Sequence, residues 1–105
     1  MTKAEQLYQD IISNIPDSKP GKMFGALCLK SAKNGKSGIM FKNDCMVFKL
    51  PQAELQKALS LDKTRLFDPS GGRPMKEWAE LPYSHADKWP HYAILAMNYV
   101  QELND

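Results

Sequence analysis

Long apolar runs are missing from this sequence of 105 residues. A helix that crosses a bilayer needs about 20 consecutive apolar residues, and no segment of the chain approaches that length. The opening residues, Met1 to Gln6, also lack the apolar stretch of a secretory signal peptide. Together these absences predict a cytoplasmic protein that has no membrane partner.

Cysteine is scarce as well, because the chain has two, Cys28 and Cys45, both within stretches expected to be strands. In a reducing compartment such residues most simply pack as small hydrophobic side chains. A disulfide between neighbouring strands is the less favoured alternative. A cysteine nucleophile needs an exposed and electropositive setting, whereas both cysteines have apolar neighbours, so we expect them to be unreactive.

No group of residues forms a catalytic, metal or nucleotide signature. His85 and His91 are six residues apart with Asp87 between them, whereas zinc ligands on one helix are about three or four residues apart. The pair Gly71-Gly72 is not followed by the Lys-Ser or Lys-Thr of a nucleotide-binding P-loop. We therefore expect a non-enzymatic protein with no metal and no cofactor.

A strong net charge is lacking too, because 14 basic residues face 12 acidic ones and give +2. The charge is still polarised: residues 1–50 carry eight lysines against four carboxylates, +4, and residues 51–105 carry six basic against eight acidic residues, −2. The candidate nucleic-acid contacts are the lysines about the first predicted β-turns, Lys30, Lys33, Lys36 and Lys42. A basic β-ribbon can follow phosphates, but a chain with two arginines and +2 predicts weak binding at most. The alternative is a solvated hairpin whose lysines keep sheet edges from aggregating.

Hydrophobic spacing predicts the elements of the fold. Apolar residues four apart from Leu7 to Ile15 predict a helix that begins at Thr2 and ends before Pro16. The rest of the chain predicts strands at 22–29, 38–41 and 45–50, a helix at 52–59, strands at 64–67 and 76–81, and a helix at 89–103. Gly25 interrupts the first strand, where we expect a bulge or a close backbone approach. Pro90 fits the first turn of the last helix.

The element order is therefore α-β(3)-α-β(2)-α. It predicts a single α+β domain, residues 1–105, with two layers: a five-stranded antiparallel sheet and helices on one face of it. We expect the core between the sheet and the last helix to contain the large aromatic residues Trp78, Trp89, Phe24, Phe41, Phe48 and Tyr99.

The stretch from Leu66 to Trp78 organises the predicted fold, because it joins two strands through a loop rich in proline and glycine. The candidate binding surface in this loop consists of Asp68, Gly71, Gly72 and Arg73. Adjacent glycines can expose backbone N–H groups, and an arginine offers a planar fork of donors to phosphate or carboxylate. The alternative is a stiffened hairpin loop in which Arg73 pairs with Asp68 or Glu77.

Several blocks of the sequence resemble the TfoX/Sxy N-terminal-domain family, whose name comes from a bacterial regulator of natural competence. They are Met23-Phe24-Gly25, Gly35-Lys36, Cys45 to Leu50, Leu66 to Ser70 and, most specifically, Arg73 to Trp78. The resemblance implies a fold of the secretion-chaperone-like group, which also contains YjbR-like proteins. It implies a regulatory or protein-interaction module, with an unknown protein or a second copy of itself as partner. The YjbR-like relatives add weak nucleic-acid binding as the alternative.

Overall fold

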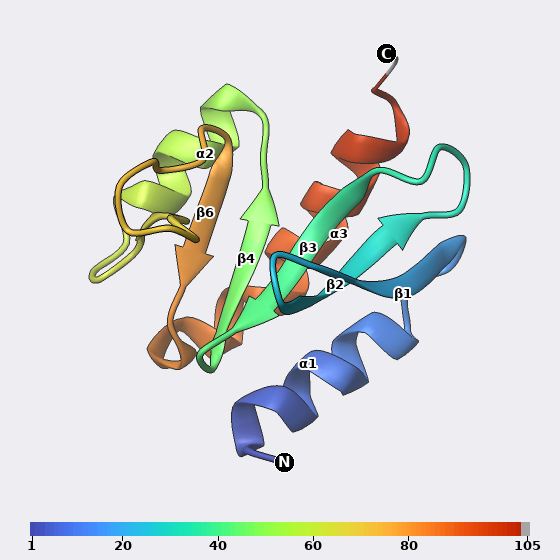
Figure 1. Cartoon of the computed structure of the whole chain (residues 1–105), viewed down its shortest axis with the longest axis horizontal. Coiled ribbons are helices and arrows are strands. Elements are labelled where there is room, and N and C mark those ends of the chain that lie inside the picture. The colour runs from blue at the N-terminus through green and yellow to red at the C-terminus, as the bar shows by residue number, and fades with distance from the viewer. Residues whose placement is uncertain (104–105) are drawn as a thin grey trace.

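The structure of the chain is a computed structural model that describes residues 1–103 (Figure 1). Its elements, in chain order, are α1 (Lys3–Ser13), β1 (Ser18–Met23), β2 (Ala26–Ser31), β3 (Ser37–Lys42), β4 (Cys45–Lys49), α2 (Gln52–Leu59), β5 (Arg65–Leu66), β6 (Trp78–Leu81), the 3-10 helix η1 (Tyr83–Lys88) and α3 (Trp89–Gln101). The α+β class predicted from the sequence is confirmed. None of the helices in the described part of the chain has the length and apolar character needed to cross a bilayer.

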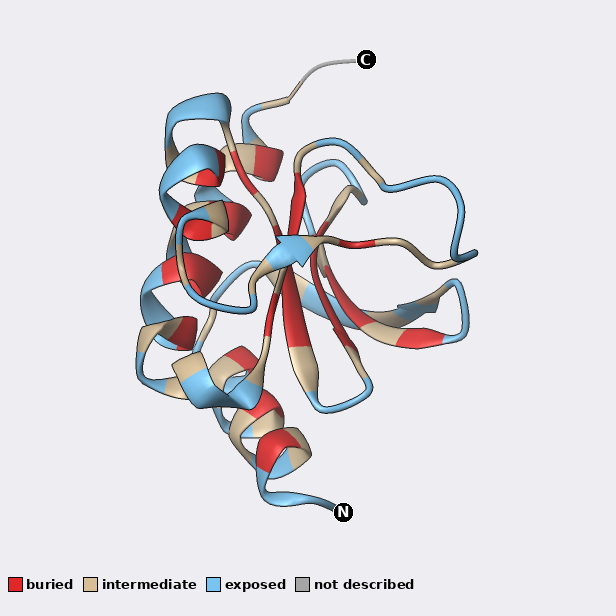
Figure 2. Ribbon diagram, turned by 90° about the vertical axis from the view of Figure 1, so that its left-hand side faces the viewer, coloured by how far each residue is buried: buried red, intermediate tan, exposed pale blue. Residues whose placement is uncertain are grey.

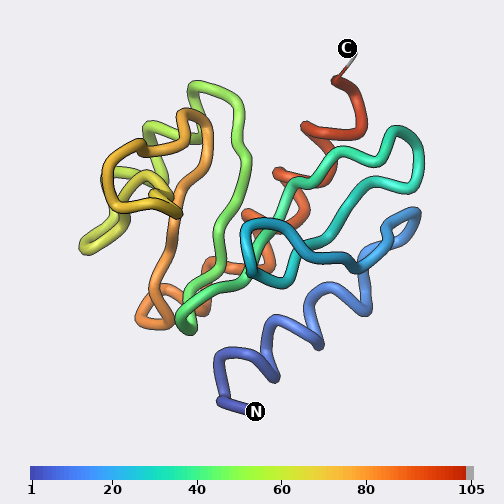
Figure 3. Tube along the Cα trace, viewed as in Figure 1, coloured from blue at the N-terminus to red at the C-terminus, as the bar shows by residue number. Residues whose placement is uncertain are grey.

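The six strands form one antiparallel sheet in the order β1-β2-β3-β4-β6-β5. The first four strands make a meander in which each strand pairs with the next. The trace in Figure 3 shows the chain leaving β4 through α2 before it returns as β5 and β6. The two edges of the sheet are therefore β5, which has two residues, and β1, which carries Pro20 near its middle.

The expected strand at 22–29 is instead a tight hairpin, and this correction raises the strand count to six. Met23 is the register partner of Ala26, so the turn consists of Phe24 and Gly25 alone. Both have positive φ, 54° and 73°, as a type I′ turn requires. Gly25 thus reverses the chain instead of forming a bulge, and residues 18–21, which precede the predicted strand, join Lys22 and Met23 in β1.

The helix starts follow the predicted signals, whereas α3 ends at Gln101 instead of the predicted Leu103. The Thr2 hydroxyl caps α1 by accepting a hydrogen bond from the Glu5 N–H at 3.1 Å. Pro90 lies in the first turn of α3, as predicted, and η1 precedes this helix. The strands about the long loop are shorter than predicted, because β5 has only Arg65–Leu66 and β6 begins at Trp78.

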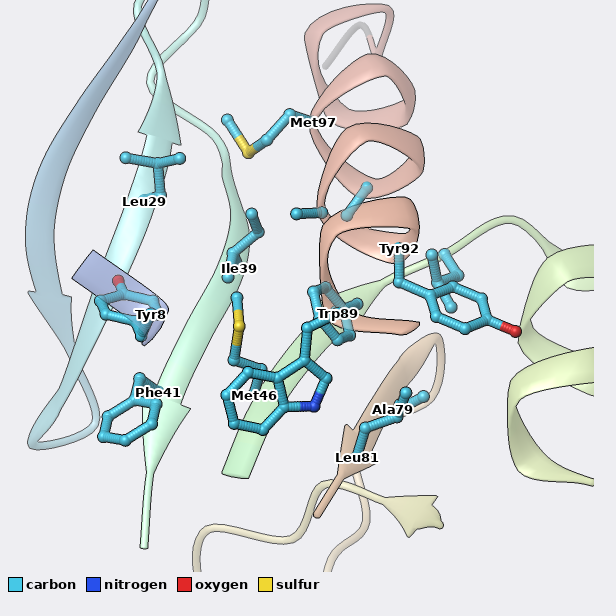
Figure 4. Packing of buried hydrophobic residues seen from close by; sticks show 14 of the residues in the cluster. Tyr8, Leu29, Ile39, Phe41, Met46, Ala79, Leu81, Trp89, Tyr92 and Met97 are labelled. Atoms are coloured by element: carbon cyan, nitrogen blue, oxygen red, sulfur yellow. The ribbon is translucent and has the colours of Figure 1, made fainter. Parts of the chain in front are cut away.

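All three α-helices contribute to one hydrophobic core against a single face of the sheet, which we call the inner face. Figure 4 shows Trp89, at the start of α3, among the strand side chains Met46, Ala79 and Leu81. At Gly38 of β3 the helix comes so close that an added Cβ would lie 2.9 Å from Met97 Sδ. Figure 2 shows the buried residues concentrated where helices and sheet meet.

The opposite side of the sheet, the outer face, has a second and smaller cluster of buried residues: Cys28, Met40, Val47, Phe67 and Trp78. Met23 and Met75 are half-buried against it. The prediction that Trp78 packs beneath the last helix is therefore wrong, since Trp89 lies on the inner face and Trp78 on the outer one. The prediction for Phe24 is also wrong, because 52% of it is exposed at the tip of the first hairpin.

Candidate functional site

The loop from Asp68 to Met75 is closed by its own aspartate. Asp68 Oδ1 accepts hydrogen bonds from four backbone N–H groups, those of Ser70 at 3.2 Å, Gly71 at 2.7 Å, Gly72 at 3.1 Å and Arg73 at 3.3 Å. These are the donors that were expected to be available to an external anion. The place that a phosphate oxygen would take is thus filled by a carboxylate of the same loop.

The charge state of Asp68 agrees with this geometry. Desolvation, the largest single influence, acts to raise the pKa of the carboxyl group, but the four backbone N–H groups together lower that pKa below its ordinary value. The carboxylate is therefore ionised at neutral pH and holds the loop in one shape.

The buried cluster of the outer face attaches the loop to the sheet. The Phe67 N–H donates to the Trp78 carbonyl at 2.9 Å, and the Met75 N–H donates to the Phe67 carbonyl at 2.7 Å. The side chains of the same three residues, Phe67, Met75 and Trp78, pack on the outer face of the sheet. The two ends of the loop are therefore structural, and its exposed residues, 70–74, are available for contacts.

Arg73 lies at the tip of this loop with an exposed side chain. The expected pairing with Asp68 or Glu77 does not form through its guanidinium, which has no carboxylate within ion-pair distance among residues 1–103. Glu77 instead accepts a hydrogen bond from the Tyr99 hydroxyl at 3.3 Å. Arg73 is therefore a free cation on a fixed loop.

The structure divides the four candidate lysines between two places. Lys33 and Lys36 lie in the loop between β2 and β3, whereas Lys30 and Lys42 are strand residues. Strand alternation places both strand lysines on the outer face, since their neighbours Leu29 and Phe41 belong to the inner core. The expected single cluster about the first turns is not formed.

Two further lysines share the outer face with Lys30 and Lys42. Lys19 of β1 is the register partner of Lys30, and Lys49 of β4 holds its Nζ 6.0 Å from the centre of the Trp78 ring. We call the group formed by Lys19, Lys30, Lys42 and Lys49 the basic face. Sequence reasoning missed the pairing of Lys19 with Lys30, because Lys19 joins the sheet only when Phe24-Gly25 is recognised as a hairpin turn.

The basic face has little negative charge of its own. Within the described strands, Glu80 is the one carboxylate that alternation directs to the outer face, and it pairs with Arg65 Nε at 3.5 Å. A Cβ built on Gly21 would lie 3.3 Å from Lys30 Cε, so the bare glycine leaves room for that lysine stem. The lysine stems thus lie along the sheet. Lys42 Nζ also donates to the Phe24 carbonyl, but within residues 1–103 none of these four ammonium groups is paired with a carboxylate.

The cysteines and histidines form no reactive group. Cys28 is buried in the outer-face cluster, and Cys45 is half-buried. Burial, followed by the nearby charge of Glu80, raises the pKa of the Cys45 thiol to about 11, so it is a poor nucleophile at neutral pH. His85 Nε2 lies 2.6 Å from the Asp62 carbonyl oxygen, and no three potential ligand residues converge on a metal position in the described part of the chain.

The helical side of the molecule has one apolar hollow of about 260 Å³ between α1 and α3. Its apolar lining comes from Ile11, Ile15, Pro90, Ala93 and Ile94. Of these lining residues, Ile94 leaves 58% of its surface exposed.

Comparisons of the chain with protein-family models, with curated proteins and with solved structures found no match.

Proposed function

We propose that this chain is a non-enzymatic binding domain whose basic face binds the phosphates of nucleic acid. One observation carries the proposal: Lys19 and Lys30 are directly opposite each other on neighbouring strands. Like charges in that position are destabilising, and a bound anion removes the repulsion. Arg73, at the tip of the loop on the same side, adds a fifth cation, which supports the expected role of this loop as a contact surface.

The arrangement supports binding without sequence specificity. Lysine ammonium groups contact phosphates as point charges and give no paired hydrogen bonds to base edges. From β1 to β4 the basic face spans about 15 Å, at about 4.8 Å for each strand spacing. Contacts of this kind depend on counterion release, so the affinity falls steeply with salt.

Fluorescence anisotropy with labelled oligonucleotides at several salt concentrations tests the proposal. If all four lysines contact phosphates of a single strand, the logarithm of the binding constant falls with the logarithm of salt concentration with a slope of about −3. The double variant Lys19→Gln, Lys30→Gln should make this slope shallower by about 1.4.

The control is the double variant Lys3→Gln, Lys57→Gln, which lowers the net charge equally but changes lysines of α1 and α2. It should bind like the unmodified chain. Equal losses in both double variants would mean that only net charge matters, and absence of binding at low salt would refute the proposal.

A second candidate function is association with another copy of the chain through the helical side. Ile94 lines the apolar hollow and leaves 58% of its own surface exposed, so the hollow and an exposed apolar side chain form one continuous apolar surface. A two-fold dimer needs a self-complementary surface of this kind, in which the same apolar patch of each copy packs against that of the other. Sedimentation velocity should then show a dimer that Ile94→Asp dissociates and that the exposed α2 control Gln56→Asp leaves intact. A monomer at every concentration would remove this candidate.

We also propose that the domain is of the TfoX N-terminal type, with the secretion-chaperone-like arrangement, and acts in the cytoplasm of a bacterium. The support is the residue blocks from Met23 to Gly25, at the turn between β1 and β2, and from Arg73 to Trp78, where the long loop enters β6. An experimental structure of a member of that family with a different strand order would contradict the assignment.

A further inference from the structure

Phe24 occupies a position that a large aromatic residue rarely adopts. It is the first residue of the two-residue turn between β1 and β2, with φ at 54°. Side chains with a Cβ are strained in this conformation, and bulky ones are uncommon there. Burial does not offset the strain, because 52% of Phe24 is exposed.

The other turns of the meander from β1 to β4 use residues that suit this backbone. The turn between β3 and β4 has Asn43 and Asp44, with φ of 53° and 60°, and the loop between β2 and β3 has Gly35 at 73°. Asparagine, aspartate and glycine are the residues that such turns favour. Phe24 is therefore the exception among the turns of the meander, and elsewhere in the chain Lys63 and Glu77 also have positive φ, 63° and 78°. Strained exposed residues of this kind are found at functional sites.

The surroundings of Phe24 connect it to the basic face. Lys42 Nζ donates a hydrogen bond to the Phe24 carbonyl at 3.4 Å. Met23, the preceding residue, packs against the outer-face cluster and so directs the hairpin toward that side of the sheet. Figure 2 shows this hairpin and the loop that follows β5 both extending from the side opposite α3.

We propose that Phe24 stacks on an unpaired base of single-stranded nucleic acid whose phosphates lie on the basic face. This inference rests on the function proposed above and names its partner more narrowly. An aromatic ring beside a row of cations is the combination by which proteins hold single strands without sequence preference. In a duplex the faces of the bases are stacked on each other, so a ring at a hairpin tip has nothing to stack on.

The test compares Phe24→Asn and Phe24→Trp with the unmodified chain. The probes are a labelled oligothymidylate of about 16 nucleotides and a duplex of the same length. Asparagine fits the turn but cannot stack, so Phe24→Asn should bind the single strand about tenfold more weakly. Its salt slope should be unchanged because the phosphate contacts remain, and its duplex affinity should also be unchanged.

Phe24→Trp gives a direct signal of stacking. Trp78 and Trp89 are buried, so an exposed tryptophan at position 24 reports on the hairpin tip. Its emission should be quenched by the single strand and not by the duplex, while its affinity for the single strand is retained. Thermal unfolding of each variant shows that the fold is intact.

The possible failures are distinguishable. Salt-dependent binding that Phe24→Asn leaves unchanged would overturn the stacking proposal and spare the basic face. Equal losses for single strand and duplex would also overturn it. Binding of polyglutamate as tightly as oligothymidylate, with no effect of Phe24→Asn, would mean that the basic face serves an acidic protein. No binding of any of these probes would remove both proposals.

Discussion

The two faces of the sheet are built in different ways. The inner face is covered by α1, α2 and α3, and its core extends from Ala4 of α1 to Val100 of α3. The outer face has a smaller cluster of five buried residues, and the lysines of the basic face lie on the same side. Stability therefore resides mainly on the inner face, and the outer face is left free to carry charge and an exposed ring. Substitutions on the inner face should therefore change mainly stability, and substitutions on the outer face mainly binding.

The largest effect is expected from truncating the two tryptophans. Trp89→Ala should lower the free energy of unfolding by about 5 kcal/mol, because its ring is fully buried beneath α3. Trp78→Ala should cost less, about 3 kcal/mol, because that ring belongs to the smaller outer cluster and lies beside the charged end of Lys49. Urea unfolding measures both values. A larger loss from Trp78→Ala would mean that the outer cluster, and not the helical layer, is the main core.

Replacing a glycine by alanine on each side of the sheet tests the same difference between the two faces. A Cβ on Gly38 would lie 2.9 Å from Met97 Sδ and 3.2 Å from the Ala96 carbonyl oxygen, so Gly38→Ala should cost about 2 kcal/mol. Gly72 has no atom within 4 Å of such a Cβ, so Gly72→Ala in the outer loop is the matched control and should be nearly neutral. The measurement is again the urea midpoint. Equal values for both would show that α3 can move away from β3 without cost.

Phe24→Asn should change the free energy of unfolding in the opposite direction. Relief of the left-handed strain should stabilise the fold by about 1 kcal/mol and raise the melting temperature by about 5 °C. Phe24→Ala is the control, because it removes the ring but keeps a residue unsuited to positive φ. Destabilisation by the asparagine would indicate that the ring makes native contacts, and the contrast between a stabilising inner face and a binding outer face would be weaker.

The smallest effect is expected from Asp68→Asn, and it depends on pH. The folded pKa of Asp68 is lowered, so the unfolded state takes up its proton first as the pH falls. Its contribution to stability is complete above the unfolded pKa, near 3.8, and is lost as the pH falls through the folded pKa. The difference between the unmodified chain and Asp68→Asn in urea unfolding should shrink over that range.

Asp62→Asn is the control for losing one exposed negative charge. A difference between the unmodified chain and Asp68→Asn that grows on acidification would contradict the loop geometry.

The inner face was largely predictable, because its signals are local. Thr2, Pro16 and Pro90 mark the helix ends, and alternation in β4 identifies Met46 and Phe48 as core residues. The outer face was not, because both sides of the central strands are apolar and alternation alone cannot say which side the helices cover.

The prediction of the basic face depended on the conformation assigned to Gly25. Gly25 in an apolar stretch suits either a bulge or a turn, and only the turn pairs Lys19 with Lys30. The closure of the loop by Asp68 could have been predicted, since an aspartate followed by Pro-Ser-Gly is typical of a turn in which the side chain accepts backbone N–H groups.

Pro20 has a consequence for how copies of this molecule meet. Counting from the hairpin, where Met23 and Ala26 exchange hydrogen bonds, Pro20 falls at a position whose backbone nitrogen is directed away from β2. That nitrogen has no hydrogen to donate. A strand of another molecule that paired with β1 would therefore lack one backbone hydrogen bond near the middle of this edge. Pro20 thereby disfavours fibril formation along β1, the longer of the two edge strands.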